Sequence, residues 1–221
     1  MISEIITECP FAIQGLFWRE GRFSISHATS MTTSADPLGR IDITLPDALI
    51  MAVPKRRSEF LAGRICAALA LRAAGLPTFV GIEGRRPVWP EGIAGSISHS
   101  NGRAVAVISA KYSQIGVDCE TVMAGDLAQK LHPEIISAAE VRLCPPDLTF
   151  AQFLTLIFSA KEAVYKALSM QLDTVPAFLD VTLATITSNR LYLVFQGQML
   201  SVYYLRSQTD CVTLLAIDPR V

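Results

Sequence analysis

The sequence of 221 residues lacks several features that would place it in common functional classes. No apolar run approaches the roughly 20 residues that a membrane-spanning helix needs. Five scattered cysteines form no CxxC pair and no zinc-ligand spacing, which predicts reduced thiols in a cytoplasmic protein. The first nine residues contain Glu4 and Glu8 but no basic residue, which argues against a secretory signal. Because 51% of the residues are hydrophobic, we expect a sizeable core.

The charge is nearly balanced overall but is unevenly distributed. The formal net charge is −1, yet residues 55–111 carry nine Lys or Arg side chains against three Glu. A locally basic segment in a neutral protein favours a compact polyanionic ligand over a long nucleic acid, so we expect no nucleic-acid partner.

The sequence predicts two long helices, each followed by strand-like segments. Pro54 precedes a helix over 55–74 that Gly75 and Pro77 end, and an apolar stripe at i, i+3, i+4 spacing predicts a second helix over 151–169. Strands are expected at 11–18, 22–27, 41–45, 94–98, 103–110, 114–119, 178–186, 190–195, 199–205 and 211–217. Residues 121–150 show little periodicity, so we expect a partly mobile loop over 121–146 that orders on partner binding.

This order predicts an α+β fold of two similar lobes, each with a long helix and antiparallel strands, related by a pseudo-twofold axis. The predicted lobes are residues 1–115 and 116–221. Ligand pockets commonly form between such units, so we expect the active site in the cleft between the lobes.

Two short segments have the composition of half-sites for one metal ion. In Gly116-Val117-Asp118-Cys119-Glu120, strand alternation places Asp118 and Glu120 on one face and Cys119 on the other, toward the core. In the predicted second helix, Glu162 and Lys166 are neighbours at i, i+4 spacing. Oxygen-only ligands favour Mg²⁺, with Mn²⁺ as the alternative. Either segment alone is more typical of a structural strand end or a solvated helix pair.

The basic side chains supply candidates for binding a phosphate ester. Arg57 and Arg64 are seven residues apart and share a helix face, whereas Arg56 is expected to be exposed. Arginine suits phosphate because its planar fork binds two oxygens at once. His99 could donate to the same ligand if protonated, or could serve a local hydrogen bond only.

Five motifs together carry a family resemblance. They are Arg-Arg-Ser-Glu-Phe-Leu-Ala-Gly-Arg (56–64), Arg-Arg-Pro-Val-Trp-Pro-Glu-Gly (85–92), Gly-Ser-Ile-Ser-His-Ser (95–100), Gly-Val-Asp-Cys-Glu (116–120) and Phe-Ser-Ala-Lys-Glu-Ala-Val-Tyr-Lys-Ala (158–167). In this order the chain resembles the 4′-phosphopantetheinyl transferases over about residues 45–205, in the monomeric group of surfactin- and enterobactin-synthetase activators. The second and third motifs look most like the enterobactin branch. Cys119 replaces a branched apolar residue, and Arg86 stands where lysine is frequent.

The resemblance implies transfer of 4′-phosphopantetheine from coenzyme A to a serine of an apo carrier protein, with release of 3′,5′-ADP. It implies that Asp118, Glu120 and Glu162 bind Mg²⁺ and that Lys166 approaches the pyrophosphate. Coenzyme A phosphates would be held by Arg64, Arg86 and His99, with Ser98 nearby and Arg57 as a further candidate. The expected partners are carrier domains of peptide synthetases, for siderophore or other nonribosomal peptide synthesis, and acyl carrier protein is a further candidate.

The chemistry of the residues is consistent with that activity. Phosphoryl-type transfer needs positioning and charge neutralisation more than covalent help. Glu162, directly or through water, could accept the serine proton, and Lys166 could stabilise the leaving phosphate. Two alternatives stay open: a non-catalytic binder of coenzyme A or carrier proteins, and a Mg²⁺-dependent nucleotide phosphohydrolase.

Overall fold

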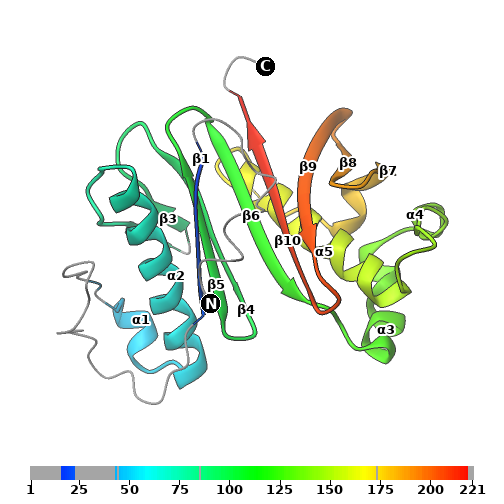
Figure 1. Cartoon of the computed structure of the whole chain (residues 1–221), viewed down its shortest axis with the longest axis horizontal. Coiled ribbons are helices and arrows are strands. Elements are labelled where there is room, and N and C mark those ends of the chain that lie inside the picture. The colour runs from blue at the N-terminus through cyan, green and yellow to red at the C-terminus, as the bar shows by residue number, and fades with distance from the viewer. Residues whose placement is uncertain (1–15, 23–42, 44, 85, 173, 219–221) are drawn as a thin grey trace.

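The first lobe is a helix packed on an antiparallel sheet (Figure 1). The computed structural model describes residues 16–22, 43, 45–84, 86–172 and 174–218. Within these residues the sheet has the order β1-β5-β4, and helix α2 packs against all three strands. The elements are β1 (Leu16–Arg22), α1 (Asp47–Ile50), α2 (Pro54–Ala73), the hairpin β2 (Gly81–Glu83) and β3 (Arg86–Val88), β4 (Ala94–Ser100) and β5 (Arg103–Ser109).

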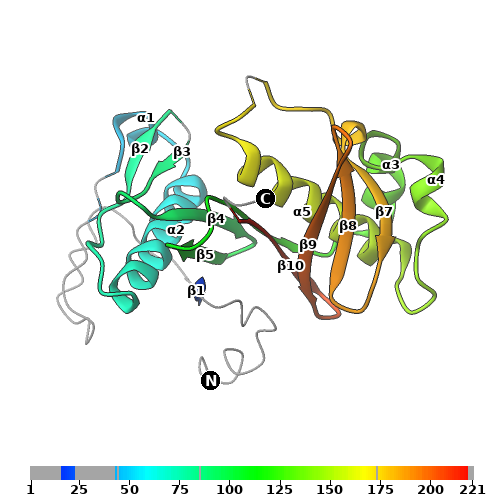
Figure 2. The same ribbon diagram turned by 90° about the horizontal axis from the view of Figure 1, so that it is seen from above.

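The second lobe repeats this arrangement with a wider sheet. Its described strands have the order β6-β10-β9-β8-β7, all antiparallel, and helix α5 packs mainly on β6 and β10. The elements are β6 (Gln114–Thr121), α3 (Gly125–Ile135), α4 (Ala138–Val141), α5 (Phe150–Leu168), the 3-10 turn η1 (Phe178–Asp180), β7 (Thr182–Ile186), β8 (Arg190–Phe195), β9 (Gln198–Arg206) and β10 (Asp210–Ile217). Figure 2 shows α2 and α5 in different lobes.

Local sequence explains where the two long helices begin. Pro54 occupies the first turn of α2, where its fixed φ suits a helix and its missing N–H costs no hydrogen bond. Thr149 caps α5 by accepting from the backbone N–H of Gln152, and the Gln152 side chain accepts from the Thr149 N–H. This reciprocal capping box satisfies two donors that a helix start leaves free.

Strand β5 is buried on both faces and supplies the shared core of the lobes. Ala104 and Ala106 point toward α2, where they join Cys66 and Ala67. Val105 and Val107 point the other way and cluster with the following residues of β6 and β10: Ile115, Val117, Cys119, Val212 and Leu214. The alternation of a strand therefore lets one segment fasten the two lobes together.

Serine side chains join the two sheets along the line where β4 meets β6. The hydroxyl of Ser96 accepts from the Val117 N–H at 3.0 Å, and that of Ser98 accepts from the Cys119 N–H at 3.3 Å. These bonds satisfy backbone donors on the edge of β6 that faces β4, which would otherwise be buried and unpaired. We call this line of contacts the serine seam.

The observed architecture confirms the predicted α+β class with antiparallel sheets. Both long helices and the later strands lie close to their predicted ranges. The predicted loop over 121–146 is wrong, because α3 and α4 occupy most of it and bury Ala128, Ile135 and Glu140. The strand predicted over 22–27 lies almost wholly outside the described residues. The strand predicted over 11–18 overlaps β1 at residues 16–18, and its first five residues also lie outside the described part of the chain. Among the described helices, none is long and apolar enough to cross a membrane.

Candidate active site

A glycine lets helix α5 approach strand β6 closely enough to form a site between them. A Cβ atom added to Gly116 would lie 1.8 Å from the Ala163 carbonyl oxygen and 2.6 Å from the Ala167 nitrogen. Only a residue without a side chain permits that approach. The close packing brings Lys166 of α5 into contact with Asp118 of β6, and Glu162 lies one helical turn before Lys166.

Asp118, Lys166 and Ser98 form one hydrogen-bonded group on the serine seam. The Lys166 ammonium donates to Asp118 Oδ1 at 2.6 Å, to Ser98 Oγ at 3.0 Å and to the Val117 carbonyl at 3.2 Å. Ser98 Oγ also donates to Asp118 Oδ1 at 2.8 Å. The Asp118 side chain is 4% exposed while that of Lys166 is 30% exposed, so the ammonium links a buried carboxylate to the surface.

The carboxylates around this group exceed the positive charge available to them. Asp118 Oδ2 is buried and has no hydrogen-bond partner. Burial, followed by the charge of Asp118, raises the pKa of Glu120 to about 7, although Ser100 donates to its Oε2 at 2.8 Å. Burial also raises the pKa of Glu162, with Lys166 opposing and Asp118 adding to the shift. The site therefore disfavours the ionised state of two of its three carboxylates.

The same three carboxylates were predicted to bind a divalent ion. Within the described residues, no three His, Cys, Asp or Glu side chains lie close enough to hold a metal together, and Lys166 occupies the position beside Asp118. Asp118 Oδ2 has no hydrogen-bond partner, and burial together with the charge of Asp118 raises the pKa of Glu120, so a cation here would stabilise both carboxylates in their ionised form. The oxygen-only donor set fits Mg²⁺ or Mn²⁺, while the present spacing does not form a coordination shell.

Cys119 is buried in the core, as predicted. Burial and then the charge of Asp118 raise the pKa of its thiol to about 12. A thiol this weakly acidic is a poor nucleophile at neutral pH, so Cys119 contributes packing only.

A cavity of about 630 Å³ opens on the other face of β4. His99 and Ile97, which alternate with the seam serines, line it together with residues of α2 and the β2–β3 hairpin. Its polar lining includes Arg56, Glu59, Arg64 and His99, and the rest is mostly apolar. A nucleotide combines an apolar base with charged phosphates, so the cavity suits such a ligand in size and in lining.

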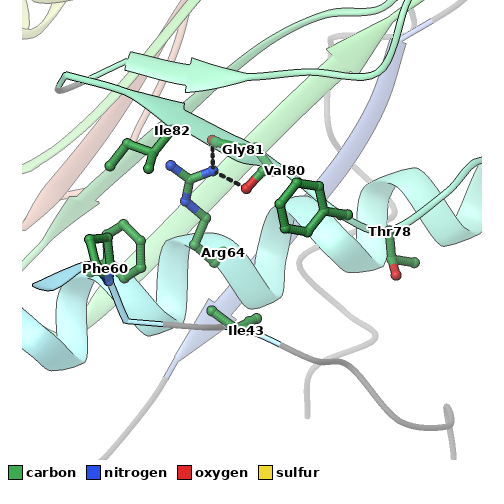
Figure 3. Close-up of a pocket in the computed structure, with 9 residues that line it drawn as sticks. Ile43, Phe60, Arg64, Thr78, Val80, Gly81 and Ile82 are labelled. Atoms are coloured by element: carbon green, nitrogen blue, oxygen red, sulfur yellow. Dashed lines mark hydrogen bonds between the residues drawn. The ribbon is translucent and has the colours of Figure 1, made fainter.

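Arg64, a predicted phosphate ligand, is largely committed to the protein backbone. Its guanidinium donates to the carbonyls of Val80 at 2.8 Å and Gly81 at 2.7 Å and lies over the Phe60 ring (Figure 3). The residue is 7% exposed, and burial lowers its pKa. It forms part of the wall between the 630 Å³ cavity and a smaller apolar cavity of about 200 Å³ bounded by Ile43, Thr78 and Phe79.

The other two predicted arginines differ in how free they are. Arg86 is exposed and donates to the Ser169 carbonyl at 3.1 Å and to Met170 Sδ at 3.2 Å, so it bridges the β2–β3 hairpin and the end of α5. Arg57 makes a long contact of 3.5 Å to the Ile50 carbonyl, and its Nε is buried without a partner. Their phosphate-binding roles stay predictions.

Two features of the site region were not anticipated from the sequence. Arg56, expected only to be exposed, contacts His99, and Glu59 lies within ion-pair distance of both. Lys161, beside Glu162 in the same motif, forms a fully buried pair with Glu140. Lys161 belongs to a motif that is recognisable in the sequence, but no local pattern in residues 121–150 identifies Glu140 as its partner.

Both lobes match sequence families of known proteins. Residues 45–109 match the 4′-phosphopantetheinyl transferase N-terminal domain, and residues 114–214 match the 4′-phosphopantetheinyl transferase superfamily. Enterobactin synthase component D of Salmonella typhimurium is 43% identical over 149 residues, which are 66% of this chain and 62% of that protein. The Escherichia coli K12 protein of the same name is 38% identical over 166 residues, 74% of this chain and 79% of the relative.

A more distant relative supports the same grouping. The 4′-phosphopantetheinyl transferase Svp of Streptomyces mobaraensis is 36% identical over 154 residues, which cover 63% of this chain and 61% of Svp. The chain thus spans less than two thirds of the length of the Salmonella and Streptomyces relatives. The two family matches, over residues 45–109 and 114–214, include all five motifs between residues 56 and 167.

Proposed function

The chain belongs to the 4′-phosphopantetheinyl transferase superfamily, and from this membership we propose that it transfers 4′-phosphopantetheine from coenzyme A to a carrier-protein serine. The observation that carries the proposal is the Asp118–Lys166–Ser98 group on the serine seam, beside a cavity of nucleotide size. The adenosine end would occupy that cavity, and the pyrophosphate would extend past His99 toward Lys166.

The reaction forms one bond and breaks one. The serine oxygen of the carrier bonds to the phosphorus that bears pantetheine, and the bond from that phosphorus to the bridging oxygen breaks, releasing 3′,5′-ADP. The serine proton would pass to Glu162, whose raised pKa makes its carboxylate a better proton acceptor than an ordinary glutamate. Lys166 would donate to the pyrophosphate oxygens as charge develops on the leaving group.

Asp118, Glu120 and Glu162 would hold a Mg²⁺ or Mn²⁺ ion. When bound, the ion would supply charge neutralisation for the pyrophosphate. The protein's own part is to keep these carboxylates together despite their repulsion, through Ser98, Ser100 and Lys166. Arg86, the most exposed of the predicted phosphate ligands, would leave Ser169 to reach the ligand.

We further propose that the acceptors are apo carrier domains of peptide synthetases, since relatives that include the Salmonella typhimurium and Escherichia coli K12 proteins bear the name enterobactin synthase component D. Siderophore-forming synthetases are the first candidates, and acyl carrier protein is a second. The protein would act as a cytoplasmic monomer, which size-exclusion chromatography with light scattering would test.

The decisive experiment is mass spectrometry of an apo peptidyl carrier protein after incubation with the enzyme, coenzyme A and Mg²⁺. We expect a mass gain of one phosphopantetheine arm, equimolar 3′,5′-ADP, and loss of the gain in Glu162→Gln. Glu91→Gln, an exposed glutamate on a first-lobe turn, is the matched control and should keep full activity. Coenzyme A binding without modification of any peptidyl or acyl carrier would indicate a binding module instead. Carrier-independent release of phosphate or phosphopantetheine would indicate a phosphohydrolase.

A further inference from the structure

His99 is held between two charged side chains of helix α2 at the cavity wall. Arg56 Nη1 lies 3.0 Å from His99 Nε2, and Glu59 Oε2 lies 3.7 Å from His99 Nδ1. Glu59 is also 3.9 Å from Arg56 Nη1 and 4.0 Å from Lys55 Nζ. One carboxylate therefore faces three potential cations at the edge of a cavity suited to an anionic ligand.

The Arg56 contact determines where the imidazole proton lies. A guanidinium has only donors, so Nε2 must accept, and the single proton of a neutral ring is then on Nδ1, the nitrogen nearest Glu59. In this state Nε2 offers no hydrogen to a phosphate. The arrangement seen here therefore cannot yet donate from His99 to a coenzyme A phosphate.

Burial and the neighbouring cations favour the neutral form of the His99 ring. Burial lowers the pKa of His99, Glu59 opposes this, and Arg56 and Lys166 lower the pKa further. Asp118 and Glu120 pair with Ser98 and Ser100 on the seam side of β4, away from the cavity. Of the hairpin cations, Arg86 is engaged with Ser169 and Met170. Among these neighbours, Glu59 is the group on the cavity side placed to stabilise an imidazolium.

We propose that Glu59 is a positioning residue that allows His99 to bind a phosphate of coenzyme A by taking up a proton. When the phosphate draws the Arg56 guanidinium away from Nε2, one proton from solvent adds to Nε2. The new Nε2–H donates to the phosphate, while Nδ1–H and the ring charge are stabilised by Glu59. The proton returns to solvent when the ligand leaves. The identity of the ligand rests on the function proposed above.

Calorimetric titration of the whole protein with coenzyme A, in buffers of different ionisation enthalpy, measures how many protons are taken up on binding. This number tests the proposal. At a pH of about 7.5 a phosphate monoester, whose second pKa is about 6, is already mostly dianionic. Any proton taken up on binding is therefore taken up by the protein. We expect uptake approaching one proton per coenzyme A in the wild type and little in Glu59→Gln. In the transferase assay, Glu59→Gln should raise the KM for coenzyme A about tenfold, the size of one lost charge-assisted contact, with kcat unchanged. Glu59→Asp should restore part of the uptake.

A second variant and a matched control complete the test. Lys55→Gln removes another ion partner of Glu59, one whose side chain is 80% exposed, and should change neither uptake nor KM. His99→Asn should abolish the proton uptake, and it provides an independent test if Glu59→Gln is poorly folded. Titration with dephospho-coenzyme A, which lacks the 3′-phosphate, identifies the phosphate that His99 binds. If proton uptake is lost, His99 binds the 3′-phosphate; if it is retained, His99 binds the pyrophosphate.

The inference and the proposed function fail in different ways. Equal proton uptake and equal KM in wild type and Glu59→Gln would overturn the role of Glu59 even if carriers are modified normally. Proton-linked coenzyme A binding that depends on Glu59 would support that role even if no carrier is modified. Wild-type binding without proton uptake would also overturn it.

Discussion

Helix α5 carries two lysine–carboxylate pairs five residues apart, and they have opposite characters. Lys161 is completely buried and donates to Glu140 at 3.0 Å, to the Ile135 carbonyl at 2.7 Å and to the Phe178 carbonyl at 3.0 Å. Glu140 also accepts from the backbone N–H groups of Ser137 and Leu183. Lys166 instead holds Asp118, whose second oxygen has no partner.

This difference supports our proposal that the inner pair is structural and the outer pair is part of the active site. In the inner pair, the ammonium has three acceptors and the carboxylate is bonded through both oxygens, so a ligand would have nothing left to bind. In the outer pair, the unpartnered oxygen and the raised pKa of Glu120 and Glu162 indicate interactions still to be made. A buried polar group without a hydrogen-bond partner is destabilising, so such groups are expected mainly at functional sites.

Breaking the inner pair should have the largest effect on stability. Lys161→Met leaves Glu140 buried with its charge uncompensated, and we expect the free energy of unfolding in urea to fall by about 3–5 kcal/mol. The exposed lysine of α3 gives the control Lys130→Met, expected within about 0.5 kcal/mol of wild type. The double variant Lys161→Met/Glu140→Leu should recover much of the loss. A single variant as stable as wild type would contradict the structural assignment.

Gly116→Ala should disturb the outer pair by displacing the helix that carries it. The added methyl group cannot fit 1.8 Å from the Ala163 carbonyl, so α5 must move away from β6. We expect a loss of about 3 kcal/mol, at the upper end of the usual cost of overpacking, together with loss of transfer activity. Gly125→Ala, where an added Cβ meets nothing within 4 Å, is the control. Wild-type stability in Gly116→Ala would show that the close approach is not required.

Two arginines predicted to share one role should separate in the same assays. Arg64→Ala removes both hydrogen bonds to the Val80 and Gly81 carbonyls, and we expect a stability loss of about 1–3 kcal/mol. Arg86→Ala removes an exposed contact, so stability should change by less than about 0.5 kcal/mol while the KM for coenzyme A rises. Chemical denaturation and steady-state kinetics of both variants test this. The reverse pattern would return Arg64 to the phosphate site.

The two carboxylate groups should give stability opposite dependences on pH. Burial favours the neutral form of Glu140, but the Ser137 and Leu183 N–H groups and then Lys161 outweigh it and lower its pKa. Its stabilisation is present above the ordinary glutamate pKa and is lost as the pH falls through the lowered value. Glu120 has a raised pKa, so its contribution is present below the ordinary value and is lost as the pH rises to about 7.

Denaturation of the metal-free protein, from pH values well below the ordinary glutamate pKa up to pH 8, measures both dependences. Glu120→Gln should reduce the decline toward pH 7, to which Glu162 with its raised pKa also contributes. Saturating Mg²⁺ should reduce that decline in the wild type by favouring the ionised carboxylates. Glu140→Gln should instead flatten the acid limb. A wild-type profile unaffected by Mg²⁺ would argue against the proposed metal ligands.

Much of the fold followed from local patterns. The helix signals at Pro54 and over 151–169, and the alternation in the later strands, predicted elements close to those observed because each depends on residues near in sequence. Helices α3 and α4 escaped prediction because Pro133 interrupts the pattern of α3 and α4 is only four residues long. Their burial depends on packing against α5 and β7, which no local period reports.

For the site, the sequence alone determined which residue types are present and on which face of an element they lie. Asp118 and Glu120 share a strand face, and Glu162 and Lys166 share a helix face, both through backbone periodicity. Only the tertiary structure decided their partners: Lys166 holds Asp118, Lys161 holds Glu140, Arg64 bonds to backbone carbonyls, and Glu59 faces His99. These pairings join residues far apart in the chain. They depend on which faces meet and on how much water is excluded there, and neither property is local.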